Sequence, residues 1–239
     1  MRFKNYKNVF TNLIKYRNVA TAYPIITMMI SYDSTRALTV TKAAENRSIL
    51  KMYSLKDYEI TFHEELGLGE NDYIKCKEME QTDDGNQFAC VYFNDGVFFL
   101  RTFGKEKRTE EEIAANELNI NELLNLEAST MPCQDLADPF ITCCWVGMDK
   151  VYVALFHGGT MTHYHFMWDV NERKLIGMND VTLGEQAVSH KMSGSRQNFP
   201  FKSFYSEEKD EIYTFYRQGQ AFTMKPSDLE NFRFEQMID

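Results

Sequence analysis

The stretch HYHFMWDV, His163–Val170, contains two histidines two residues apart and ends in a Trp-Asp pair. Successive side chains of a strand point to opposite faces, so this stretch and the two residues before it divide into two sets. The sets are Thr162, Tyr164, Phe166 and Trp168 on one face, and Met161, His163, His165 and Met167 on the other. Both sets are largely apolar or aromatic. The stretch therefore predicts a strand that is covered by protein on both faces.

The pattern around this stretch recurs along the chain, which indicates a repeat of about 40 residues. Four units follow one another from Ile25, and each has a strand, a polar turn, a second strand, another turn and a third strand. The third strand of each unit ends near one large residue, and these residues are Tyr53, Phe103, Trp168 (followed by Asp169) and Met224. In three units an apolar strand restarts seven or eight residues later, at Ile60, Ile176 and Phe232. The second unit lacks a clear fourth strand.

An inserted segment, residues 109–128, follows the second unit. Thr109 and Glu112 have the spacing of a capping box, and the acids that lead the segment suit the start of a helix. We expect a helical insertion here, with a possible break at Asn119–Asn121. The acidic run at 110–112 is more typical of a solvated first turn than of a docking face.

The units resemble those of the WD40-repeat family of β-propellers. The resemblance rests on the Asp-containing turns YDSTR (residues 32–36) and TDDGN (82–86), on the third strands that end in an aromatic residue, and on the Trp168-Asp169 pair. The Gly-His pair that precedes each unit in the family is absent. The resemblance implies an all-β, propeller-like array of about four four-stranded blades over residues 25–239, with the helical insertion after the second blade. Four blades would form either a small closed ring or an open arc.

Residues 1–24 form a separate basic segment in this prediction. Residues 1–32 contain five basic residues and no acid, while the net charge of the 239-residue chain is -9, so the remainder carries -14. An acidic body argues against general nucleic-acid binding. We expect the basic segment to be an extra strand or the remnant of a further blade. An import sequence, which would make the protein mitochondrial, is the less favoured alternative.

The cysteine set favours a reducing compartment. The five cysteines form no C-x-x-C pair, and the adjacent Cys143 and Cys144 would point to opposite faces of a strand. We expect buried thiols and a cytoplasmic protein. The longest apolar run, Tyr23–Ile30, is far shorter than the about 20 residues that span a bilayer, so no membrane span is expected.

Two places in the sequence are candidates for a site. His163 and His165 lie on one face of a strand and His157 ends the preceding strand, so the three imidazoles would converge on a metal ion across a hairpin. The favoured interpretation of these histidines is a hydrogen-bonded layer between blades. The segment 189–198, which joins the third and fourth units, carries His190, Lys191 and Arg196 among small residues and would suit an acidic or phosphorylated partner. An exposed linker is the favoured interpretation of the second segment.

These patterns predict a non-enzymatic protein-interaction or scaffold module, a structural subunit of a larger complex, without a cofactor. Blade faces left uncovered by an open arc would bind protein partners or a second copy. The first alternative is a metal-dependent enzyme that uses the three histidines. The second is a truncated propeller without independent activity.

Overall fold

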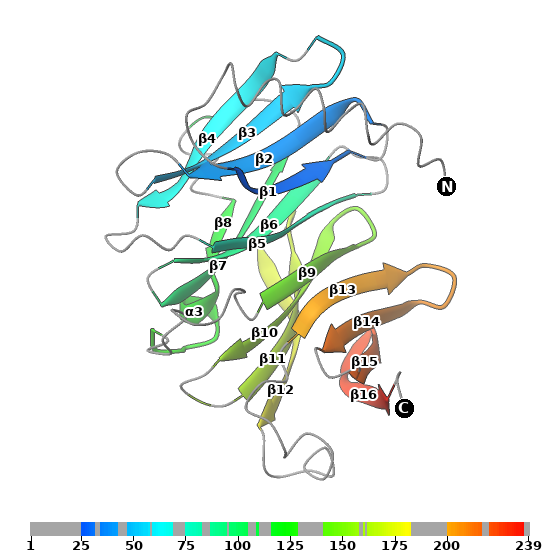
Figure 1. Ribbon diagram of the computed structural model, residues 1–239. Helices are drawn as coiled ribbons and strands as arrows, with labels where there is room; N and C mark the ends of the chain where they lie inside the picture. Colours follow the sequence, from blue (N-terminus) through cyan, green and yellow to red (C-terminus); the bar gives the residue numbers. More distant parts are fainter. Residues whose placement is uncertain are drawn as a thin grey trace. The chain divides into compact units, whose positions relative to one another are not determined.

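The computed structural model describes residues 25–31, 34–42, 47–57, 59–68, 75–82, 87–94, 96–104, 109, 116–128, 141–157, 160, 162–182, 200–216 and 220–236 (Figure 1). In these residues nearly all regular structure is strand, in four antiparallel sheets of four strands each. This confirms the predicted all-β array of four-stranded units. Within the described ranges, no helix has the length and apolar character needed to cross a membrane. The chain divides into two compact units, residues 1–74 and 75–239.

The first unit contains one sheet, whose strands follow one another in chain order. The strands are β1 (Ile25–Ile30), β2 (Arg36–Lys42), β3 (Arg47–Ser54) and β4 (Ile60–Leu68). The turn between β1 and β2 is closed by the Ser31 hydroxyl oxygen, which accepts a hydrogen bond from the Arg36 amide at 3.0 Å. Alternation along β2 and β3 gives one face four buried apolar side chains: Leu38, Val40, Leu50 and Met52.

The second unit contains three sheets, each again in chain order. The first consists of β5 (Lys75–Gln81), β6 (Gln87–Asn94), β7 (Val97–Gly104) and β8 (Glu117–Asn119). The next consists of β9 (Ile141–Val146), β10 (Lys150–His157), β11 (Thr162–Asp169) and β12 (Lys174–Thr182). The last consists of β13 (Pro200–Ser206), β14 (Glu211–Tyr216), β15 (Gln220–Lys225) and β16 (Asp228–Gln236).

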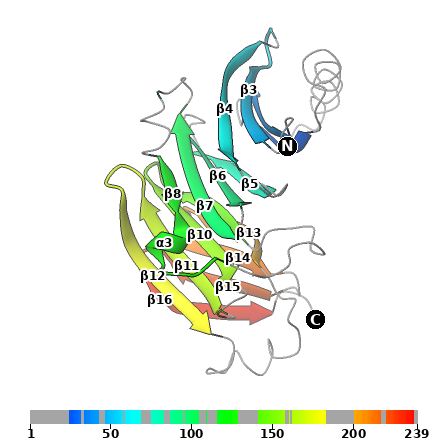
Figure 2. The same cartoon turned by 90° about the vertical axis from the view of Figure 1, so that its left-hand side faces the viewer.

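The sheet β9–β12 lies between the other two sheets of this unit. Its first strand, β9, contacts both β5 and β13, and its last strand, β12, lies beside β16 (Figure 2). Odd-numbered residues of β10, such as Val151 and Val153, pack with β6 and β7, while Tyr152 and Ala154 pack with β14 and β15. The neighbours Cys143 and Cys144 likewise enter opposite clusters. The prediction of strands buried on both faces is therefore confirmed for this sheet.

The four residues that mark the repeat occupy equivalent positions in their sheets. Each is the second-last residue of the third strand of its sheet, and each pairs with the second residue of the preceding strand. The pairs are Tyr53 with Ala37, Phe103 with Phe88, Trp168 with Val151 and Met224 with Ile212. Asp169, next to Trp168, accepts a hydrogen bond from the Glu172 amide at 2.7 Å through Oδ1 and so fixes the turn that follows β11.

The predicted helical insertion is minor in the part of it that the structure describes. In the described part of residues 109–128, the regular elements are the short strand β8, Glu117–Asn119, and the single-turn helix α3, Ile120–Leu123. The second sheet thus does have a fourth strand, contrary to the sequence prediction. Asn119 caps α3 through its side chain, which accepts from the Glu122 amide at 3.2 Å. The helix begins at the position where the sequence suggested a break.

Helix α3 serves to place one buried carboxamide. The Asn121 side chain accepts a hydrogen bond from the Phe98 amide at 2.9 Å and donates to the Glu127 carbonyl at 3.1 Å. It thereby joins the start of β7 to the segment that follows the helix. A carboxamide whose oxygen and nitrogen both form hydrogen bonds has a small free-energy cost of burial, and its hydrogen bonds fix the local geometry.

Candidate functional site

Two of the predicted features lie outside the described residues. These are the basic segment 1–24 and the loop with His190, Lys191 and Arg196. Both stay predictions. The candidate sites among the described residues are the three histidines and the polar or aromatic groups of the three sheets of the second unit.

The structure does not bring the three histidines together. His157 pairs with Thr162 across the β10–β11 hairpin, so Phe156, rather than His157, lies opposite His163. His157 is therefore on the other face of the sheet, where its Nε2 lies 3.0 Å from the Glu127 carbonyl oxygen and its Nδ1 lies 3.1 Å from the Thr160 hydroxyl. Within the described ranges, no group of three or more His, Cys, Asp or Glu residues is placed to hold a metal ion. The convergence that the metal hypothesis requires is absent.

His165 instead belongs to a polar network between two sheets. Its Nδ1 lies 2.6 Å from the Tyr152 hydroxyl, and its Nε2 lies 3.2 Å from the hydroxyl of Tyr216 on β14. Tyr152 also contacts the Thr214 hydroxyl at 2.8 Å, and Thr214 in turn contacts Ser203 at 3.1 Å. Burial lowers the pKa of His165 to about 4, so the imidazole is neutral at pH 7. The network fixes the sheet β13–β16 against β9–β12.

His163 lies on the same face but without such partners. Both ring nitrogens are buried, and in the described part of the chain neither has a hydrogen-bond partner. The ring packs between Phe156 and Tyr216, with centroid distances of 4.8 and 5.2 Å. Burial, with a smaller contribution from His165, lowers the pKa of His163 to about 3. These contacts place His163 in the core between sheets, as a neutral aromatic ring.

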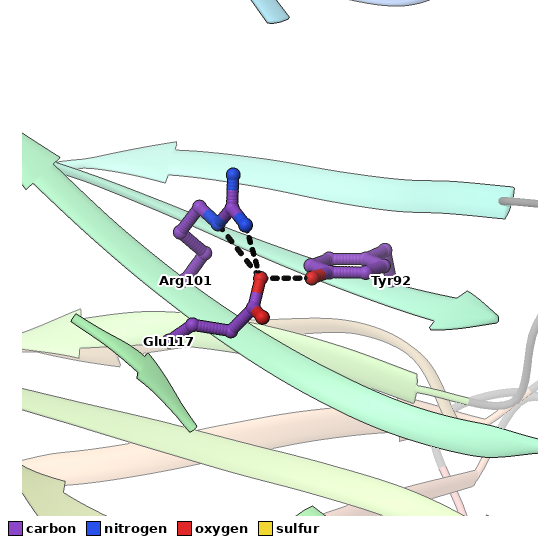
Figure 3. A network of polar contacts seen from close by, with 3 residues as sticks. All are labelled: Tyr92, Arg101 and Glu117. Atoms are coloured by element: carbon purple, nitrogen blue, oxygen red, sulfur yellow. Dashed lines mark hydrogen bonds and ion pairs between the residues drawn. The ribbon is translucent and has the colours of Figure 1, made fainter. Parts of the chain in front are cut away.

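A second polar cluster lies on the face of β6–β8 that points away from the sheet β9–β12 (Figure 3). The Arg101 side chain donates to one oxygen of Glu117, through Nε at 2.9 Å and also through Nη2. The Tyr92 hydroxyl donates to the same oxygen. Arg101 is almost fully buried, and burial raises the pKa of Tyr92. The carboxylate of Glu117 offsets part of the free-energy cost of burying the positive charge of Arg101.

An aromatic face covers the side of the sheet β13–β16 that points away from β9–β12. We use this name for Phe201, Phe204, Tyr213 and Phe215. Phe204 stacks on Tyr213 and Phe215, with centroid distances of 4.8 and 5.6 Å. Phe201 and Phe204 remain 45% and 40% exposed. Stacked aromatic side chains with this exposure are typical of a surface that another protein covers.

The sequence reasoning missed both polar networks, although one signal for the second was present. Arg101 stands in FFLRTF, residues 98–103, where its strand neighbours on the same face are Phe99 and Phe103. A charge at such a position predicts a buried partner. The partner, Glu117, stood in a segment expected to be helical, which concealed the pair.

Comparison with known proteins found similar solved structures but no sequence family. No family model and no curated protein matches the sequence. Similar solved structures include U3-55K (10% identity, TM-score 0.48, 90% of this chain and 52% of that chain covered) and the WD40 domain of Neurospora crassa Pan2 (9%, 0.49, 90% and 50%). A third is the β-propeller domain of Myceliophteria thermophila Cps50 (Swd1), at 10% identity and TM-score 0.48, with 91% and 54% covered. The chain spans about half the length of these chains and is similar in fold to WD40 β-propeller domains.

Proposed function

We propose that the protein is a non-enzymatic interaction module that forms part of a larger assembly, and that the aromatic face is one of its contact surfaces. The observation that carries this proposal is the exposure of Phe201 and Phe204 within a stack of aromatic rings. Covering this face removes apolar area from water, and each aromatic ring does so with little loss of side-chain entropy. The occupant is a protein surface that supplies apolar side chains, either from another chain or from a second copy.

Charged groups at the edge of this face support a specific contact. The Lys209 ammonium lies 5.7 Å from the centroid of the Tyr213 ring, and Glu211 pairs with Arg233. An apolar centre with a mixed-charge rim is the common arrangement of protein interfaces. The described cysteines, Cys90, Cys143 and Cys144, are buried free thiols, which supports our proposal that the assembly is cytoplasmic.

The experiment introduces a charge on the aromatic face and measures the size of the complex that contains the protein. The protein is expressed at its native level. We expect the wild-type protein to migrate in sedimentation and native gels well above the mass of a single chain. Phe204→Glu should shift it to the single-chain position, because a carboxylate opposite an apolar partner is costly to bury. Ile60→Glu is the matched control, since Ile60 is also 41% exposed but lies on β4 of the first unit.

Two outcomes would contradict the proposal. One is a wild-type protein that migrates as a single chain in a native extract. The other is a Phe204→Glu variant that is folded by circular dichroism and still migrates with the assembly. An equal effect of Ile60→Glu would point to general destabilisation rather than to this face.

A further inference from the structure

A groove lies in the second unit between the ends of β6 and β7 and the turn that joins β11 to β12. It has a volume of about 300 Å³. Its polar lining comes from Gln87, Thr102, Asn116, Asn171 and Arg173. Phe103 and Val170 supply apolar surface. A groove with convergent polar groups and an apolar wall has the composition of a binding site.

Among the residues that the structure describes, the groove lining carries one charged group, the Arg173 guanidinium, and no carboxylate. The adjacent acid, Glu172, forms an ion pair with Lys174. A smaller recess of about 30 Å³ shares part of the lining and reaches Glu117, but that carboxylate is bonded to Arg101 and Tyr92. Glu117 and Glu172 thus have other cationic partners, and the described lining presents a positive charge on a chain of net charge -9.

The turn that carries Arg173 is held in place by the strands around it. Asp169 accepts from the Glu172 amide, and the Val170 amide donates to the Asp149 carbonyl at 2.9 Å. Arg173 itself has a left-handed backbone, with φ of 52°. Such a conformation is unfavourable for a residue with a side chain and persists where the surroundings enforce it. The backbone of Arg173 is thus held in one conformation, so a ligand that binds there needs to order only its side chain.

We propose that this groove binds an acidic peptide segment, with an Asp or Glu carboxylate on Arg173 and a neighbouring aliphatic side chain against Phe103 and Val170. In the described lining, one guanidinium among neutral carboxamides matches one negative charge. A phosphate group carries nearly two charges and usually meets several cations, so it fits this lining less well. The small recess, lined in part by Leu100, Leu118 and Trp168, admits little more than a methyl group, which favours a short aliphatic neighbour. This inference rests on the proposed function and names the partner chemistry of a second surface.

The test uses three libraries of heptapeptides, passed over the immobilised full chain. The central residue is Glu in the first library, Gln in the second and phosphoserine in the third, and the flanking residues are Ala, Val or Leu. We expect the Glu library to be retained about tenfold more strongly than the Gln library, as is typical for one charge-assisted contact. Retention should weaken as the salt concentration rises.

Variants of Arg173 give the decisive comparison. Arg173→Gln should reduce retention of the Glu library about tenfold, and Arg173→Lys should retain part of it, because the charge remains while the two-pronged geometry is lost. The matched control is Lys225→Gln, which removes an exposed cation on β15 that lies outside the groove lining. It should leave retention unchanged.

Equal retention of the Glu and Gln libraries, stronger retention of the phosphoserine library, or an Arg173→Gln variant that binds like the wild type would each overturn the proposal. These outcomes are separable from a failure of the proposed function. The peptide experiment uses the purified chain and needs no native partner, while the migration experiment uses Phe204→Glu, which leaves the groove lining unaltered.

Discussion

Lowering the pH from 7 to 4 is expected to remove several kcal/mol from the free energy of unfolding of the second unit, because two buried histidines must take up protons when the chain unfolds. In the folded chain, burial lowers the pKa of His165 to about 4 and that of His163 to about 3. The unfolded chain binds protons near the ordinary histidine value of about 6.5. The contribution is therefore fully present above this value and is lost as the pH falls toward 4 and 3.

His163 can be isolated from the many carboxylates that also titrate in this range. His163→Phe keeps a ring between Phe156 and Tyr216 and removes two buried nitrogens that have no hydrogen-bond partner in the described part of the chain. Such a replacement should be neutral or slightly stabilising at pH 7. At pH 4 the variant should be more stable than the wild type by about 3 kcal/mol, since each pKa unit is worth about 1.4 kcal/mol.

The measurement is urea unfolding at a series of pH values, followed by tryptophan fluorescence. Both tryptophans, Trp145 and Trp168, lie in the second unit, so the signal reports on that unit. A stability difference between variant and wild type that stays constant from pH 7 to pH 4 would contradict the placement of His163 as a buried neutral ring.

Glu117→Leu is expected to lower the free energy of unfolding by about 3 kcal/mol, because it removes the carboxylate that Arg101 and Tyr92 both contact. The Arg101 side chain is 5% exposed and that of Glu117 is 25% exposed, so the pair is only partly reached by solvent. Removing Glu117 takes away the carboxylate oxygen to which both Nε and Nη2 of the buried Arg101 donate. Tyr92→Phe, which removes one hydrogen bond to the same oxygen, should cost about 1 kcal/mol.

A double-mutant cycle separates the loss of the pair from the loss of packing. The double variant Arg101→Met with Glu117→Leu should recover most of the stability lost in Glu117→Leu, since no buried charge then remains. The measurement is urea unfolding of the four proteins at pH 7. If the two single losses simply add in the double variant, Arg101 and Glu117 do not act as a pair.

Much of the fold can be predicted from the sequence because the repeated pattern shows where the strands of each sheet begin and end. The pattern of strands and turns predicts that Tyr53, Phe103, Trp168 and Met224 are equivalent, and all four are the second-last residue of the third strand of their sheets. The two-sided burial of the strand Thr162–Asp169 followed from its alternation, since both sets of side chains are apolar or aromatic. The strand β8 could not be found in this way. It has three residues, and its Glu117 is explained only by Arg101 on the neighbouring strand.

The candidate sites were harder to predict because they depend on pairing between strands. A shift of one residue in a hairpin moves every side chain to the other face, and the sequence does not state that register. The observed pairing of His157 with Thr162 places His157 and His163 on opposite faces of the sheet, so the predicted convergence of the three histidines does not occur. The aromatic face and the groove at Arg173 each combine side chains from different strands and turns, and their composition becomes visible only when the sheets are placed.

The central claim, that the aromatic face is covered in the native assembly, is tested most directly by hydroxyl-radical footprinting of its side chains. In the dilute purified chain, Phe201 and Phe204 should be oxidised readily, as their exposure of 45% and 40% implies. In the native assembly both should be protected several-fold, while Phe98, which is 2% exposed, stays unreactive in both samples. Equal oxidation of Phe201 and Phe204 in the assembly and in the purified chain would contradict the claim.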